Sequence, residues 1–278
     1  MELFSTHDPA WLAGLAAALG LTGLVAGIMA GLLGVGGGIV IVPVLYHMFT
    51  LLGLDEAVRM HLAVGTSLAT IIPTSLRSAR AHYARGGLDP DLLRSLAPSV
   101  FAGAVLGGLG GSLVDGAVLG AIFGIVALLV AVNMALPSQR SALAASLPAG
   151  PARGLIGAVI GGLSTLMGIG GGTLSVPVLS LFNYPIHRAV GTASALGLII
   201  SVPGTAGFVW SGLGVAGRLP GSIGYVNLIG FALIVPLTLL AAPIGARIAH
   251  SVNPARLRQA FALFLAVTSV RMLLDVLY

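Results

Sequence analysis

Residues 34–45 read GVGGGIVIVPVL, and residues 168–179 read GIGGGTLSVPVL. A shorter echo follows each copy, AVGTS at residues 63–67 and AVGTA at residues 189–193. Two matched motifs in the same order indicate an internal duplication. Each glycine block also interrupts an apolar segment. Interrupted segments at corresponding places in two halves are typical of a transporter's binding site.

The composition places this chain in a membrane. Its residues are 57% apolar and only 8% charged, with a mean hydropathy of +1.06, whereas a soluble domain carries about 25% charged residues. Backbone groups in lipid must bond internally, and long apolar runs without strict alternation favour helices over a barrel. The absence of cysteine excludes disulfides and thiolate metal sites.

Ten apolar segments are expected, five in each half. The fold class is therefore all-α, a polytopic membrane protein of two inverted repeats with glycine-broken helices. The repeats are expected at residues 1–137 and 152–278, with a connecting loop at 138–151. The segments themselves fall at about 10–33, 36–52, 60–82, 92–113, 115–136, 152–168, 171–183, 188–211, 221–247 and 256–277. The short segments beside the glycine blocks are either half-helices or short spans.

The arginines predict the orientation. All thirteen cations are arginine, and their position between apolar spans is explained by topology, so no nucleic-acid partner is expected. An outside N-terminus leaves only Arg59, Arg218 and Arg271 outside and puts the other ten inside. Both termini are then expected on the outer, periplasmic side. Because each half has an odd number of spans, the two halves are inverted. The ten inside arginines are Arg77, Arg80, Arg85, Arg94, Arg140, Arg153, Arg188, Arg247, Arg256 and Arg258.

The glycine blocks are the expected substrate site. Consecutive glycines let a ligand approach the main chain, and a helix that restarts after them presents unpaired N–H groups and a positive dipole end. Two such ends around one cavity would suit a small anion. Pro43 and Pro177 are expected to break the restarted helices. The expected substrate-binding glycines are Gly34, Gly36, Gly37, Gly38, Gly168, Gly170, Gly171 and Gly172. Tight helix crossing is the alternative explanation for them.

Hydroxyl groups of the echoed motif are further candidates. Thr66, Ser67, Thr192 and Ser194 can donate hydrogen bonds to an oxyanion without adding charge to the membrane; the alternative is a bond within their own helix. Ser164, Thr165, Thr173 and Ser175 are weaker candidates for the same reason. Arg77 and Arg80 would form the inner mouth of the path or extend to the cytoplasmic surface.

Small residues recur at every fourth position, a spacing that lets helices approach closely. Intramolecular packing is the first interpretation and a homodimer interface the second. The stripes are Gly23, Gly27, Gly31; Gly103, Gly107, Gly111; Gly116, Gly120, Gly124; and Gly157, Gly161.

No carboxylate lies deep in an expected span, which disfavours a proton relay and fits passive anion efflux. His47 and His61 lie near the outer ends of their segments. Interfacial packing is the first interpretation for them, and a role in proton transfer is the alternative. The chain shows neither a metal-ligand cluster nor a Gly-x-Ser-x-Gly sequence, so no enzyme activity, cofactor or metal is expected.

The doubled Gly-x-Gly-Gly-Gly motif with its proline, together with the Ala-Val-Gly-Thr echoes, resembles the TauE/SafE sulfite exporter family over essentially the whole chain. This resemblance implies export of sulfite or small organosulfonates such as sulfoacetate across the bacterial inner membrane. Ala193 stands where the first half has Ser67, so the two sides of the pocket differ. An anion channel, a carrier of another small anion and a non-transporting membrane subunit are the alternatives.

Overall fold

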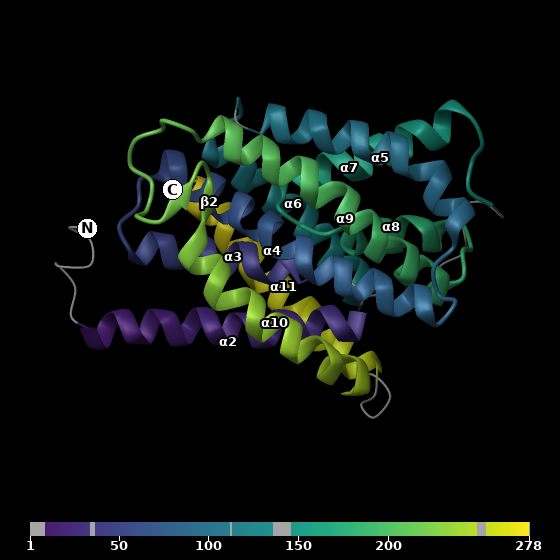
Figure 1. Ribbon diagram of the computed structural model, residues 1–278, viewed down its shortest axis with the longest axis horizontal. Helices are drawn as coiled ribbons and strands as arrows, with labels where there is room; N and C mark the ends of the chain where they lie inside the picture. The colour runs from purple at the N-terminus through teal and green to yellow at the C-terminus, as the bar shows by residue number, and fades with distance from the viewer. Residues whose placement is uncertain (1–8, 34–36, 112, 136–145, 249–253, 278) are drawn as a thin grey trace.

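The computed structural model describes the chain in five stretches, residues 9–33, 37–111, 113–135, 146–248 and 254–277. These stretches form ten helices and one short hairpin (Figure 1), which confirms the all-α fold class predicted from the sequence. The helices are α2 (Pro9–Leu33), α3 (Gly38–Leu51), α4 (Glu56–Ala84), α5 (Pro90–Gly110), α6 (Gly116–Ala135), α7 (Pro151–Leu166), α8 (Gly171–Leu181), α9 (Ile186–Ser211), α10 (Leu228–Ile248) and α11 (Pro254–Leu277). The hairpin pairs β1 (Ser222–Ile223) antiparallel with β2 (Val226–Asn227).

Within the described residues, five helices are long and apolar enough to cross a membrane. They are the helices whose apolar parts run over Ala13–Gly31, Pro90–Gly110, Gly116–Ala135, Ile186–Ser211 and Leu228–Gly245. The two helices that follow the glycine blocks are shorter. At about 1.5 Å per residue, the 14 residues of α3 and the 11 of α8 fall short of a hydrocarbon core about 30 Å thick.

One expected apolar segment starts later than the sequence indicated. Residues 221–227 form the hairpin, and α10 begins only at Leu228. Gly221 and Gly224 adopt positive φ angles of 76° and 56°, which glycine tolerates and other residues rarely adopt. These turns prevent a helix over residues 221–227, where hydropathy alone predicts one.

Side-chain caps fix the entries of the longer helices. Asp55 accepts a hydrogen bond from the Ala57 N–H at the start of α4, and Asp89 accepts bonds from the Asp91 and Leu92 N–H groups at the start of α5. Such caps satisfy amide groups that a helix leaves without an internal partner. The Asp89 carboxylate also contacts Tyr184 and Arg188.

The two halves of the chain make corresponding contacts. Helix α2 of the first half packs on α10 of the second, and α7 of the second half packs on α5 of the first; these pairs lie at opposite edges of the bundle in Figure 1. Glycines line both contacts. A Cβ atom at Gly23 would lie 2.6 Å from the Ile234 carbonyl oxygen, and one at Gly107 would lie 2.7 Å from that of Gly162. The third helices of the halves, α4 and α9, pack on each other between the two pairs.

Candidate functional site

A cavity of about 580 Å³ lies between α4 and α10. The start of α8, the α9 residues Ala193 and Ser194, and the α2 residues Ala30 and Gly31 complete its walls. Its volume exceeds what one small anion and its first waters require. The positions of its polar groups therefore decide what it can hold.

One face of α4 supplies most of the polar lining. Thr74, Ser75, Ser78, His82 and Arg85 follow one another at intervals of one, three or four residues, so their side chains share one side of the helix. Arg77, which sequence reasoning placed at the inner mouth, also lines the cavity. None of the described lining residues is acidic. The cavity is thus a positively charged compartment that attracts anions.

The second glycine block supplies the cavity with a helix N-terminus. Gly170 is extended and precedes α8, whose first two residues, Gly171 and Gly172, line the cavity. The first N–H groups of a helix have no carbonyl one turn earlier, and they carry the positive end of the dipole. Gly171 also has to be small, because a Cβ atom there would lie 2.6 Å from the Ala193 carbonyl oxygen of α9.

Two hydroxyl groups lie in the cavity wall where α4 meets α9. Ser78 Oγ donates to Ser194 Oγ at 3.0 Å, and Ser194 Oγ donates to the Val190 carbonyl at 3.0 Å. Ser194 therefore lines the cavity and is also bonded within its own helix. An anion that accepts the Ser78 hydrogen bond in place of Ser194 would lie beside the arginine face.

Gly37 and Gly38, the described glycines of the first block, do not line this cavity. Gly37 has a φ of 72° at the start of α3, and a Cβ atom on Gly38 would lie 2.7 Å from the Gly168 carbonyl oxygen. The two blocks therefore contact each other. Ser67 Oγ reinforces the contact by donating to the same Gly168 carbonyl at 2.7 Å. Gly34 and Gly36 lie outside the described residues.

The two motif threonines each link one half of the chain to the other. Thr66 Oγ1 accepts a bond from the Asn227 N–H at 2.9 Å, and Thr192 Oγ1 accepts one from the Asp89 N–H at 3.1 Å. Asn227 and Asp89 each precede the fourth helix of their half and cap it. Neither threonine lines the cavity, and each instead fixes the loop that leads into α10 or α5.

The remaining predicted residues that the structure describes do not line the cavity. Arg80 is exposed and is not among the cavity residues, although it lies only one turn from Arg77. Pro43 lies inside α3 and Pro177 inside α8, and both helices continue through them. Thr165 donates to the Gly161 carbonyl within its own helix. The hydroxyls of Ser164, Thr173 and Ser175 are buried and, within the described residues, have no hydrogen-bond partner.

These observations agree with the comparison to known proteins. Residues 19–272 match the family described as sulfite exporter TauE/SafE. The chain belongs to the TauE/SafE sulfite exporter family.

Relatives named as probable membrane transporter proteins support this membership. One from Haemophilus influenzae is 31% identical over 91% of this chain and 96% of its own length. Another, from Methanocaldococcus jannaschii, is 28% identical over 91% of the chain and 94% of its own length. A third, YunE of Bacillus subtilis, is 31% identical over 68% of the chain and 77% of its own length. No solved structure matches the chain. The protein is accordingly a multi-pass membrane transporter.

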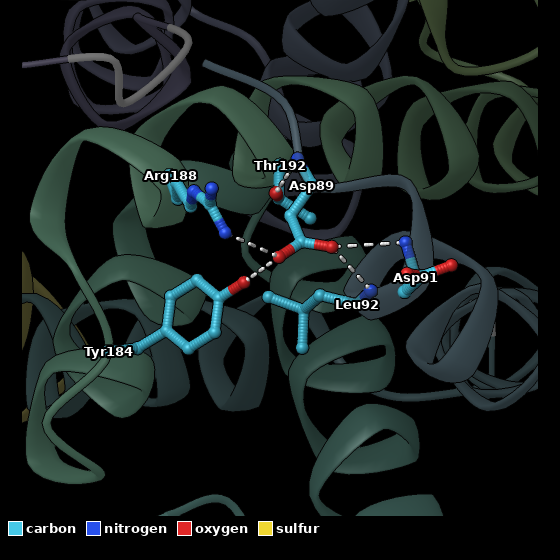
Figure 2. A network of polar contacts seen from close by, with 6 residues as sticks. All are labelled: Asp89, Asp91, Leu92, Tyr184, Arg188 and Thr192. Atoms are coloured by element: carbon cyan, nitrogen blue, oxygen red, sulfur yellow. Dashed lines mark hydrogen bonds and ion pairs between the residues drawn. The ribbon is translucent and has the colours of Figure 1, made fainter. Parts of the chain in front are cut away.

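In this TauE/SafE family member, a polar network lies where the loop after α4 meets the loop before α9 (Figure 2). The Asp89 carboxylate accepts a hydrogen bond from the Tyr184 hydroxyl and lies 3.6 Å from the Arg188 guanidinium. Bonds from the Leu92 N–H and Tyr184 hold the pKa of Asp89 below its usual value. Burial, followed by the bond to Asp89, raises the pKa of Tyr184 to about 12. The network joins the two halves on the side where α4 ends.

Of the α4 residues that line the cavity, sequence reasoning identified only Arg77. Thr74, Ser75, Ser78, His82 and Arg85 were not singled out as site residues, although Thr74, Ser78, Ala81, His82 and Arg85 carry a helical period of small and polar residues. That period was the available signal. Among the described residues, no three His, Asp or Glu side chains are grouped to hold a metal ion.

Proposed function

We propose that this transporter exports small sulfur-containing anions, either sulfite or two-carbon organosulfonates such as sulfoacetate, from the cytoplasm by alternating access. The observation that carries the proposal is the cavity, where Arg77, His82, Arg85 and the N-terminus of α8 surround one space with no acidic lining residue. Family membership supports the sulfur-containing substrate. The charge of the lining supports an anion of any oxyacid.

The matched contacts support the inverted-repeat part of the proposal. Helix α2 packs on α10 as α7 packs on α5, and Thr66 accepts from Asn227 as Thr192 accepts from Asp89. An exchange of equivalent partners is what a two-fold relation between halves produces. With the arginine-rich side cytoplasmic, such a relation inverts the halves in the membrane and leaves both ends of the chain periplasmic.

Substrate binding is assigned to the second glycine block and the α4 face. The N–H groups of Gly171 and Gly172 and the hydroxyls of Ser75, Ser78 and Ser194 would bind the oxygen atoms. Arg77 and Arg85 would supply the balancing charge. A charge-assisted hydrogen bond is about twice as strong as a neutral one, so the arginines should dominate affinity.

The test compares arginines of one helix. Arg77→Gln and Arg85→Gln should each raise the KM for sulfoacetate in inverted vesicles about tenfold, because a hydrogen bond to a charged group contributes roughly 1.5–3 kcal/mol. Arg80→Gln is the matched control, since Arg80 is exposed on the same helix outside the cavity. Equal effects of all three substitutions would contradict this site. Competition by sulfite, sulfate, taurine and thiosulfate would then define the substrate.

An anion channel is the second candidate, because a glycine-lined path with fixed positive charge also suits conduction. Saturable flux and stimulation by substrate on the opposite side would exclude it. Linear flux without counterflow would establish it.

A further inference from the structure

The cavity has a counterpart surface in the other half of the chain. Counting from the echoed Ala-Val-Gly-Thr motif, the α4 residues Ser75, Ser78, His82 and Arg85 correspond to positions on α9. The corresponding residues are Ser201, Gly204, Phe208 and Ser211. They lie in the C-terminal half of α9, beyond the cavity residues Ala193 and Ser194.

This counterpart surface is closed. A Cβ atom on Gly204 would lie 2.9 Å from Thr165 Cγ2 of α7 and 3.1 Å from Leu68 Cδ1 of α4. One on Gly207 would lie 2.8 Å from the Gly108 carbonyl carbon of α5. Helix α5 thus lies against α9, whereas the equivalent helix α10 lies across the cavity from α4 and lines it through Leu239, Ala242 and Pro243.

Buried hydroxyls mark the closed surface. Ser164 of α7 is fully buried and, within the described residues, its hydroxyl has no partner. Counted from the glycine blocks, Ser164 corresponds to Ala30, which lines the open cavity. Thr205 and Ser211 of α9 also carry buried hydroxyl oxygens that have no partner among the described residues. Unsatisfied buried groups are uncommon and costly, and a state in which water or an anion reaches them accounts for their presence.

We propose that Ser201, Gly204 and Ser211 of α9, with Ser164 of α7 and the start of α3, form the outward-facing half of the anion path. This inference rests on the proposed function and adds a second site to it. In the outward-facing state the α5–α7 pair moves away from α9, and the α2–α10 pair closes onto α4. The N-terminus of α3, now against Gly168, then faces the outer cavity as the N-terminus of α8 faces the inner one.

The two half-sites differ in charge. Arg77, His82 and Arg85 of the inner surface correspond to Pro203, Phe208 and Ser211 of the outer one. At these three positions the outer surface therefore carries no cation, and its hydroxyls and helix N–H groups bind a small oxyanion more weakly. Weak outer binding speeds release after each outward transition. The gradient and the membrane potential still set the direction of net flux.

Labelling of single cysteines tests the second surface, and the absence of native cysteine makes every introduced thiol unique. The probe is a charged, membrane-impermeant methanethiosulfonate, applied to right-side-out and to inverted vesicles. Ser78→Cys should react from the inner side, and Ser201→Cys and Ser211→Cys from the outer side. If neither outer position reacts from outside while Ser78→Cys reacts from inside, the proposed outer surface is wrong.

A second substitution shifts the balance between the two states. Gly204→Val crowds the Thr165 and Leu68 side chains in the closed surface, so it should increase outer labelling of Ser201→Cys several-fold and decrease inner labelling of Ser78→Cys. Gly154→Val is the control, because no atom lies within 4 Å of a Cβ there. Equal labelling in the two backgrounds would overturn the proposed movement.

A positive charge introduced into the outer half-site tests whether it binds the anion more weakly than the inner one. Ser211→Arg should lower the KM for sulfoacetate uptake from the outer side about fivefold, as one partly exposed ion pair contributes up to about 1 kcal/mol. An unchanged outer KM would contradict the weak outer half-site. If no anion is carried by any form of the protein, the proposed function fails, and the labelling pattern still decides whether two alternating surfaces exist.

Discussion

Gly171 combines two requirements in one residue. It lines the cavity, and a Cβ atom on it would lie 2.6 Å from the Ala193 carbonyl oxygen and 2.7 Å from the Gly197 nitrogen. The absence of a side chain therefore permits the packing of α8 on α9 and leaves the main chain accessible from the cavity. The packing interpretation accounts for Gly171, and substrate binding by the glycine block stays a prediction.

We expect Gly171→Ala to push α8 away from α9 and to reduce sulfoacetate flux at least tenfold. Overpacking of this kind costs about 1–3 kcal/mol. Flux in proteoliposomes, normalised to the reconstituted protein, measures the effect. Gly154→Ala provides the control, because its added methyl group meets nothing within 4 Å. Normal flux in Gly171→Ala would show that neither role depends on this glycine.

Asp89 should contribute stability that depends on pH. Hydrogen bonds lower the pKa of its carboxyl in the folded protein, so this contribution is present above the unfolded pKa and is lost as pH falls through the folded pKa. Asp89→Asn should therefore lower the melting temperature at neutral pH, by a few degrees for about 1 kcal/mol. The difference from the wild type should vanish in acid.

Asp91→Asn is the matched control for this measurement. Asp91 lies two residues away, and its pair with Arg94 is almost fully exposed, with side chains 95% and 81% accessible. Exposed pairs of this kind contribute little, so the melting temperature should stay unchanged. A pH-independent loss in Asp89→Asn would mean that the charge of Asp89 adds nothing beyond the capping geometry.

Between helices, the small-residue stripes pack this chain against itself. A Cβ atom at Gly27 would lie 2.5 Å from the Thr238 carbonyl oxygen, and one at Gly124 would lie 2.6 Å from Leu273 Cγ of α11. Close backbone approach of this kind is how helices associate in lipid, where burial of apolar surface no longer drives them together. The intramolecular interpretation of the stripes accounts for these contacts, and a homodimer stays a prediction.

Gly27→Ala should destabilise the α2–α10 pair by about 1–3 kcal/mol, because the added methyl group meets backbone atoms that cannot rotate away. The melting temperature in detergent measures this loss. Gly14→Ala in the same helix should be neutral or slightly stabilising, since nothing lies within 4 Å of its added atom and alanine is the better helix former. Similar behaviour of the two variants would contradict a tight α2–α10 contact.

The order and approximate limits of these helices could be predicted from the sequence, because long apolar runs and glycine or proline boundaries are local features. The 221–227 hairpin could not, since its strands have only two residues each and follow an apolar pattern. The surroundings of the two glycine blocks could not be predicted from the sequence either. Gly38 and Gly172 occupy matching places in the sequence, yet only Gly172 lines the cavity. Matched sequences adopt different surroundings whenever a duplicated chain occupies an asymmetric state, which no local pattern specifies.

At the scale of the whole molecule, the position of the carboxylates bears on the energy source. Among the described residues, carboxyl groups lie in loops or near helix ends. Asp275 lies two residues before the end of α11, 3.9 Å from His47 Nδ1. Arg59 and Arg271 lie close enough to His47 to act on it electrostatically. A proton relay needs ionisable groups within the membrane, and besides Arg77 and Arg85 the described part of the cavity wall offers only His82.

Export should therefore follow the membrane potential and not the pH gradient. An inside-negative potential favours outward movement of an anion by about 2.3 kcal/mol per charge per 100 mV, and none of the described cavity residues is a carboxylate that could carry a proton. Sulfoacetate is the right substrate for this test, because its sulfonate and carboxylate stay ionised where sulfite titrates. Proteoliposomes in which potential and pH gradient are set independently give the measurement. His47→Gln and His82→Gln should leave the potential dependence unchanged. If flux instead follows the pH gradient and His47→Gln abolishes that response, the His47–Asp275 pair carries the proton and passive efflux is wrong.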